Sequence, residues 1–189
     1  MKYIILLTVF FLQFSLFAQK SCEYSSNLAD SLGTYKSTKE YMIYEHNFAG
    51  NTNYIFFSLI NSNGMPLLNL QTVQKSEDFI KANCLDANSK IYLQLTNGKI
   101  ITLIHNSAEN CGTLLRLDNE NKNTRLNNGT FMFVKGSIAD LKSAPVSLMK
   151  IKYALETVDY VFRKEFVSEF NKETYYPETY FMDYLQCVE

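Results

Sequence analysis

Four cysteines constrain the fold of this chain more than any other feature, provided that they are oxidised. They are Cys22, Cys84, Cys111 and Cys187. In an exported protein an even number of cysteines indicates disulfide bonds, whereas in the cytosol the same residues would stay reduced. Sequence alone allows three pairings of four cysteines. Whether the chain is exported therefore decides how its cysteines are interpreted.

The N-terminus has the composition of an export signal. Lys2 supplies a positive charge, residues 4–17 are mostly apolar, and Ala18 is the small residue that a signal peptidase prefers. The apolar run is shorter than the ~20 residues that a transmembrane helix needs. We therefore predict a signal peptide over 1–18, one β-rich globular domain over 19–189, and a periplasmic or secreted location without a membrane span.

A hairpin pattern is centred on Asn97-Gly98. Runs of apolar and β-branched residues flank this dipeptide within 91–104. Asn-Gly favours a two-residue type I′ turn, in which both residues have positive φ. Such a loop would place Leu95 opposite Ile100. Both faces of this hairpin would carry apolar side chains, which predicts that other elements cover it on both sides.

The same hairpin brings Cys84 and Cys111 to one end, so we predict a disulfide between them. The remaining pair, Cys22 and Cys187, would then join the two ends of the mature chain. Lipidation is the competing fate of Cys22, but the preceding Gln-Lys-Ser does not fit a lipoprotein signal. If the chain were not exported, four free thiols would be expected.

Hydrophobic periodicity predicts further strands and a C-terminal helix. Strands are expected over 41–44, 54–60, 67–73, 113–117, 130–134 and 146–155. Segment 158–170 fits a strand to about residue 164 or a helix, and the strand is favoured.

The intervening segments are more polar. Residues 22–40 predict an extended or loosely helical lead-in, 76–80 a short capped helix, 118–129 a loop or long turn, and 137–141 one helical turn. The predicted fold class is α+β, mostly antiparallel β: a curved sheet or sandwich of about eight short strands with a C-terminal helix.

Composition and motifs exclude several classes of function. The formal net charge of −1 argues against a nucleic-acid partner. The two histidines, His46 and His105, lack metal-ligand spacing, and neither a nucleophile elbow nor a phosphate loop is present. No catalytic residue, metal or cofactor is therefore predicted. A Cys–His pair with His105 would need a free thiol, which the predicted disulfides remove.

Aromatic and acidic residues near the C-terminus are the remaining candidates. After Pro177, an apolar stripe runs along one helix face and predicts core packing: Tyr180, Phe181, Tyr184, Leu185 and Val188. Tyr175 and Tyr176 lie outside this stripe, so we predict that they are exposed and form a possible binding surface. Glu165, Glu169 and Glu173 alternate with basic residues, which is typical of a solvated surface.

The order of these features resembles that of small uncharacterised exported proteins of Bacteroidota. The resemblance rests on the signal ending Phe17-Ala18, the early cysteine, the Asn-Gly hairpin, a strand over 146–153 and a terminal helix ending in Cys187. It implies an exported location and a β-rich build, and it carries over no functional residue.

We therefore expect a non-enzymatic envelope protein that binds or scaffolds an envelope protein or a glycan. One alternative is a periplasmic hydrolase whose carboxylates converge only in the fold. The other is a carrier of a small ligand in a cavity between sheet and helix.

Overall fold

The computed structural model describes residues 20–31, 33–117 and 121–189; the predicted signal peptide lies outside them. Within the described residues, eleven strands form one antiparallel sheet, and two short strands form a separate hairpin. The fold is thus β-rich α+β, as predicted. The strands outnumber the expected eight because the lead-in and the polar segments also pair.

The long strands make up one layer of the molecule. This layer contains β1 (Tyr24–Asp30), β2 (Gly33–Thr38), β3 (Tyr41–Phe48), β4 (Asn51–Ser62), β5 (Met65–Ser76), β8 (Thr113–Leu117) and β9 (Lys122–Phe133). The tight turns that join β3 to β4 and β4 to β5 have positive φ at Ala49-Gly50 and Asn63-Gly64. These are the type I′ geometries that suit the twist of a hairpin.

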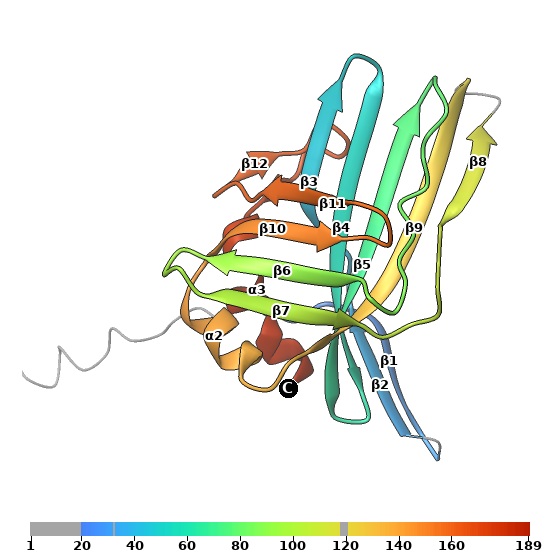
Figure 1. Cartoon of the computed structure of the whole chain (residues 1–189). Coiled ribbons are helices and arrows are strands. Elements are labelled where there is room, and N and C mark those ends of the chain that lie inside the picture. Colours follow the sequence, from blue (N-terminus) through green and yellow to red (C-terminus); the bar gives the residue numbers. More distant parts are fainter. Residues whose placement is uncertain (1–19, 32, 118–120) are drawn as a thin grey trace, which may run out of the picture.

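The shorter strands form a second layer that crosses the first (Figure 1). It contains β6 (Lys90–Leu95), β7 (Ile100–His105), β10 (Val146–Lys152) and β11 (Thr157–Val161). The two layers belong to one sheet, because β7 pairs with the end of β9, with Leu103 opposite Phe133. The sheet therefore bends over and encloses its own core.

Helical segments close one end of this core (Figure 1). The remaining elements are α2 (Ser137–Ser143), β12 (Phe166–Val167), β13 (Thr174–Tyr175), η2 (Pro177–Thr179), α3 (Tyr180–Tyr184) and η3 (Leu185–Val188). Tyr180 and Phe181 are buried, and their ring centroids lie 5.6 and 5.8 Å from that of Phe57 on β4. The C-terminal helix and its apolar stripe are confirmed. Burial of each large apolar side chain contributes ~1.5–3 kcal/mol to the free energy of folding.

The hairpin at Asn97-Gly98 forms with a different turn from the one predicted. The loop has three residues, since the N–H of Leu95 donates to the carbonyl of Lys99 (2.8 Å), and of the dipeptide only Gly98 has a positive φ. Gln94, rather than Leu95, therefore lies opposite Ile100. The expected register was wrong by one residue.

This register shift decides which side chains enter the core. Ile101 and Leu103 lie buried on the same face as Leu93 and Leu95, while Ile100 is 64% exposed. A shift of one residue moves a side chain to the other face of a strand. The hairpin is therefore covered on one side only, and the expected cover on both sides was wrong.

The polar segment 118–129 was predicted to be a loop, but β9 begins at Lys122. Its backbone pairs with β5 on one side and with β8 on the other. Two buried side chains of β9 also donate hydrogen bonds: Arg125 to the carbonyls of Ile80 (3.2 Å) and Cys111 (3.1 Å), and Asn127 to that of Asn83 (2.7 Å). The Asn127 Oδ1 and Thr124 Oγ1 atoms are buried without a hydrogen-bond partner among the described residues. Hydrogen bonds thus replace the apolar contacts that a buried strand normally makes.

These hydrogen bonds also explain why no helix follows Ser76. The hydroxyl of Ser76 accepts a hydrogen bond from the N–H of Asp78 (3.0 Å), as a helix cap would. However, side chains of β9 donate hydrogen bonds to the carbonyls of Glu77, Asp78 and Ile80. In a helix these carbonyls would accept hydrogen bonds from backbone N–H groups four residues later. The segment 77–89 is instead an irregular connection between the layers.

Three other predictions are refined by the structure. The lead-in is not helical: it forms the β1–β2 hairpin. The ambiguous segment 158–170 is a strand as far as Val161, within β11. Leu155, placed on a buried face by its alternation, is 87% exposed because β10 ends at Lys152 and the chain turns there.

Both predicted disulfides are present, Cys84–Cys111 and Cys22–Cys187. An antiparallel bridge between Leu85 and Asn110 lies directly beside the first. The segment after β7 carries one extra residue, which offsets the altered turn and restores the cysteines to opposite positions. Two disulfides indicate an oxidising, extracytoplasmic compartment.

We predict that the disulfide between the chain ends contributes more stability than the internal one. The two bonds span 165 and 27 residues, and in the chain-entropy model such loops are worth ~5 and ~3.5 kcal/mol respectively. Urea unfolding of the double variants Cys22→Ser/Cys187→Ser and Cys84→Ser/Cys111→Ser measures both losses. A larger loss for the second variant would contradict the prediction.

Candidate functional site

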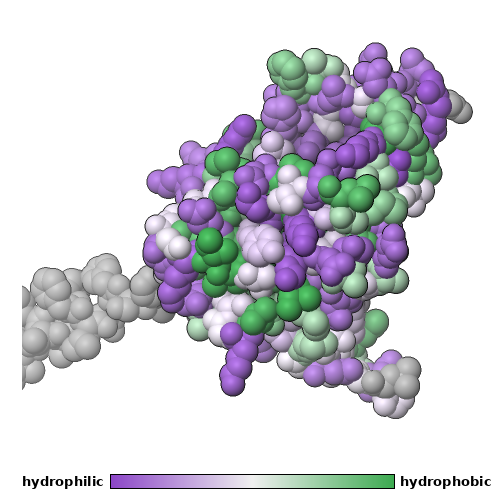
Figure 2. Space-filling view, in the orientation of Figure 1, coloured by the Kyte–Doolittle hydropathy of each residue, from purple (hydrophilic) through white to green (hydrophobic). Residues whose placement is uncertain are grey.

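A surface pocket of about 620 Å³ lies beside the C-terminal helix, a volume typical of small-ligand sites. Its walls come from the N-terminal segment, the junction of β2 and β3, β13 and α3. Tyrosines and charged residues dominate the lining: Tyr41, Tyr175, Tyr180, Tyr184, Lys20, Glu23, Lys39, Glu40 and Glu173. On the face of the molecule that Figure 2 shows, hydrophobic residues are scattered among hydrophilic ones.

The pocket forms where two strands follow one another along the same edge of β4. β2 pairs with β4 as far as Ser37, and β3 pairs with it from Tyr41 onwards. At this junction the N–H of Leu59 on β4 donates to the hydroxyl of Thr38 instead of to a strand carbonyl (2.9 Å). Lys39 and Glu40 bridge the gap and face solvent. The interrupted edge leaves space that the two chain ends partly fill.

A cluster of tyrosines forms the aromatic wall of the pocket. The ring centroid of Tyr41 lies 5.0 Å from that of Tyr175, 5.2 Å from that of Tyr180 and 5.3 Å from that of Tyr184. The Tyr41 hydroxyl accepts a hydrogen bond from the N–H of Tyr176 (2.7 Å). Burial raises the pKa of Tyr41, Tyr175 and Tyr184. All these phenols are therefore neutral at physiological pH.

The predicted binding pair, Tyr175 and Tyr176, does not form one exposed surface. Tyr175 is only 8% exposed, because β13 pairs with β12 and the ring stacks on Phe166 at 5.6 Å. Its hydroxyl donates to Glu173 (2.8 Å) and accepts from Asn171 (2.7 Å). Tyr176 is 39% exposed. The expectation of exposure was wrong for Tyr175, which instead forms part of the pocket wall.

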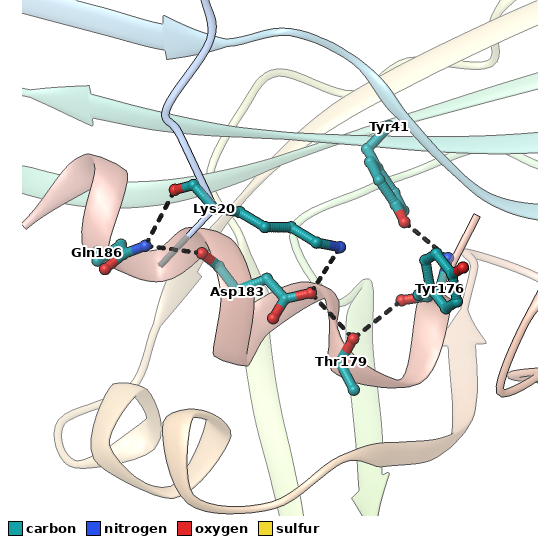
Figure 3. A network of polar contacts seen from close by, with 6 residues as sticks. All are labelled: Lys20, Tyr41, Tyr176, Thr179, Asp183 and Gln186. Atoms are coloured by element: carbon teal, nitrogen blue, oxygen red, sulfur yellow. Dashed lines mark hydrogen bonds and ion pairs between the residues drawn. The ribbon is translucent and has the colours of Figure 1, made fainter. Parts of the chain in front are cut away.

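A polar network joins the N-terminal segment to the C-terminal helix (Figure 3). The Lys20 ammonium lies 3.0 Å from the carboxylate of Asp183, which also accepts a hydrogen bond from the Thr179 hydroxyl (3.0 Å). The same ammonium lies 5.1 Å from the ring centroid of Tyr176 and 5.6 Å from that of Tyr184. Lys20 thus makes an ion pair and two cation–π contacts at once.

The Lys20 ammonium remains charged in this environment. Partial burial lowers its pKa, but the hydrogen bond and the negative charge of Asp183 outweigh burial, so the pKa is raised. A second ion pair lines the pocket, in which the Lys39 ammonium lies 2.8 Å from the carboxylate of Glu23. The hydrogen bond and charge of Lys39 lower the pKa of Glu23. Both ion pairs are exposed enough for solvent to screen them.

Three other candidates from the sequence, His105, His46 and Glu169, lie outside this pocket. His105 contacts the carbonyl of Asp86 (2.8 Å) and the hydroxyl of Ser107 (2.7 Å), and both nearby cysteines are bonded to each other. His46 lies on β3, far in the sequence from His105 and from both of these cysteines. Glu169 donates its backbone N–H to the carboxylate of Glu45 (3.1 Å), in a segment that is not helical. Nucleophilic Cys–His chemistry is therefore unavailable.

No metal-binding group of three or more His, Cys, Asp or Glu residues occurs in the part of the chain that the structure describes. Over the same residues, none of the helices has the length and apolar character needed to cross a bilayer.

Sequence reasoning missed two residues that line this pocket, Lys20 and Tyr41, and the ion-pair partner of Lys20, Asp183. Each had an ordinary local interpretation: a residue after the signal, a strand residue and a polar helix position. The tyrosine pattern near the C-terminus was the only signal that pointed to the region.

We predict that stability falls above about pH 10, the ordinary pKa of tyrosine. Burial raises the pKa of Tyr153 and Tyr180, so the folded state keeps protons that the unfolded state loses. The stability is therefore intact below that pH and decreases above it, by at most about 1.4 kcal/mol per pH unit for each such tyrosine. Urea unfolding between neutral pH and pH 11 should show a shallower decline for Tyr180→Phe.

The exposed Tyr35 provides the control, since Tyr35→Phe should leave the decline unchanged. Equal declines in Tyr180→Phe and in the unsubstituted protein would contradict the prediction.

Comparison of the chain with protein-family models, curated proteins and solved structures finds no match. The fold and the pocket are therefore interpreted from this chain alone. The resemblance to exported proteins of Bacteroidota stays a prediction.

Proposed function

We propose that this chain is a non-enzymatic binding module of the cell envelope, periplasmic or secreted, and that the tyrosine-lined pocket is its ligand site. The observation that carries the proposal is the pocket itself: about 620 Å³ lined by aromatic rings and charged groups. Rigid aromatic walls with a few polar groups are typical of recognition sites. An envelope protein or a glycan is the expected class of partner.

One carboxylate of the pocket, that of Glu23, favours binding over hydrolysis. Glu23, Glu40 and Glu173 all line the pocket, and the hydrolase alternative would use them. A general acid needs a carboxyl with a raised pKa. The hydrogen bond and charge of Lys39 lower the pKa of Glu23, which keeps this group ionised.

We predict that Thr174→Trp abolishes ligand capture. Thr174 is exposed on β13 and lines the pocket, so a large ring at this position fills the space without entering the core. Native mass spectrometry after incubation with envelope extract should detect a bound species on the unsubstituted protein and none on Thr174→Trp.

Thr157→Trp is the matched control, because Thr157 is an exposed threonine on β11 that does not line the pocket. It should retain the bound species. Equal capture by both tryptophan variants, or no capture by the unsubstituted protein, would refute the proposal.

A further inference from the structure

Lys20 and Tyr184 both line the pocket, and the contacts of the Lys20 ammonium show which chemistry suits this edge of it. It lies against two tyrosine rings, Tyr176 at 5.1 Å and Tyr184 at 5.6 Å, and beside the Asp183 carboxylate at 3.0 Å. An ammonium is attracted to the negative faces of aromatic rings and to a carboxylate. Tyr184 lines the pocket, and Tyr176 and Asp183 lie beside it through their contacts with Lys20, so the three groups form a subsite for a cation at the pocket edge.

Lys20 is held there weakly enough to leave. Its side chain is 41% exposed, and exposed ion pairs contribute little to stability. The backbone two residues further on is fixed by the Cys22–Cys187 disulfide. The lysine side chain can therefore swing out of the subsite while the segment that carries it stays in place.

Outside the two ion pairs of Lys20 and Lys39, the charged groups that line the pocket are negative. Lys39 is neutralised by Glu23 at 2.8 Å. Glu173 accepts hydrogen bonds from two neutral groups, the Tyr175 hydroxyl and the Asn171 amide. Among the described residues Glu40 has no ion-pair partner. Two carboxylates thus line the pocket without a cation of their own.

We propose that the pocket recognises a primary ammonium group on an aliphatic chain, as in the lysine side chain of a peptide, and that Lys20 is an internal competitor for the subsite. This inference rests on the proposed binding function and names the chemical class of its ligand. The incoming ammonium would replace that of Lys20 between Tyr176, Tyr184 and Asp183. Glu40 and Glu173 would attract it to the pocket.

Removal of Lys20 distinguishes a cationic ligand from an anionic one. The probes are the amides of Nα-acetyl-lysine, Nα-acetyl-norleucine and Nα-acetyl-glutamate, titrated into the intact mature protein while NMR follows the tyrosine rings. Lys20→Ala should bind the lysine probe at least roughly threefold more tightly, because the subsite is vacant. Asp183→Asn should bind it at least roughly threefold more weakly.

Lys150→Ala is the matched control, since Lys150 forms a similar exposed ion pair with Asp159 (2.8 Å) on β10 and β11. It should leave all affinities unchanged. Thermal unfolding of each variant checks that the fold is retained, and Tyr184→Leu provides a second substitution of the subsite that removes no charge.

Three results would overturn the inference: weaker binding of the lysine probe by Lys20→Ala, preference for the glutamate probe, or no binding of the lysine probe to Lys20→Ala. The proposed function is judged separately by extract capture. A ligand that is captured by the unsubstituted protein and lost in Thr174→Trp, without any response to the lysine probe, would retain the site and refute only the class of ligand.

Discussion

The covalent link between Cys22 and Cys187 is the constraint on which the rest of the candidate site depends. It holds the N-terminal segment against the C-terminal helix, where the Tyr24 hydroxyl donates to the carbonyl of Cys187 (2.9 Å). Asn61 on β4 donates to the next carbonyl, that of Val188 (2.8 Å). Lys20 therefore lies beside Asp183 even though 163 residues separate them in the sequence. Without this link two flexible ends would have to meet at an entropic cost.

The two ends of the protein interior are built on different physical principles. At the helix end, aromatic rings close the core by apolar burial, with Phe57, Tyr180 and Phe181 in mutual contact. At the far end of the long strands, buried polar side chains such as Arg125 and Asn127 bind the carbonyls of the connection 77–89. The Cys84–Cys111 disulfide fixes that connection covalently. Each end thus has one disulfide and its own packing chemistry.

The pocket combines features that favour recognition. Its aromatic wall is rigid because Tyr41 contacts three other rings and its hydroxyl is occupied by the N–H of Tyr176. Its charged groups lie at the periphery, where they keep contact with solvent. A rigid apolar wall with charged groups around it loses little entropy on binding and still selects a ligand by charge. This arrangement is the basis of the proposed binding role.

Short-range sequence patterns determined much of the fold, because turn chemistry and alternation act over a few residues. The β-rich class, most strands, the C-terminal helix and the partners of all four cysteines followed from them. The correct pairing of Cys84 with Cys111 survived a turn that differed from expectation, since one extra residue after β7 offset the shift. A disulfide at the open end of a hairpin can therefore form even when the turn differs by one residue, provided that the segment after the strand makes up the difference.

Only the tertiary structure decided which faces are buried and which residues meet. The inward face of the 91–104 hairpin depended on a register that the core selects, and the strand over 122–133 depended on partners on both sides. Tyr175 is buried because β12 and the tyrosine cluster cover it. The Lys20 ammonium meets residues 176, 183 and 184, which come from the other end of the chain. No local pattern encodes such a meeting, because the free energy of burial and pairing is a property of the assembled chain.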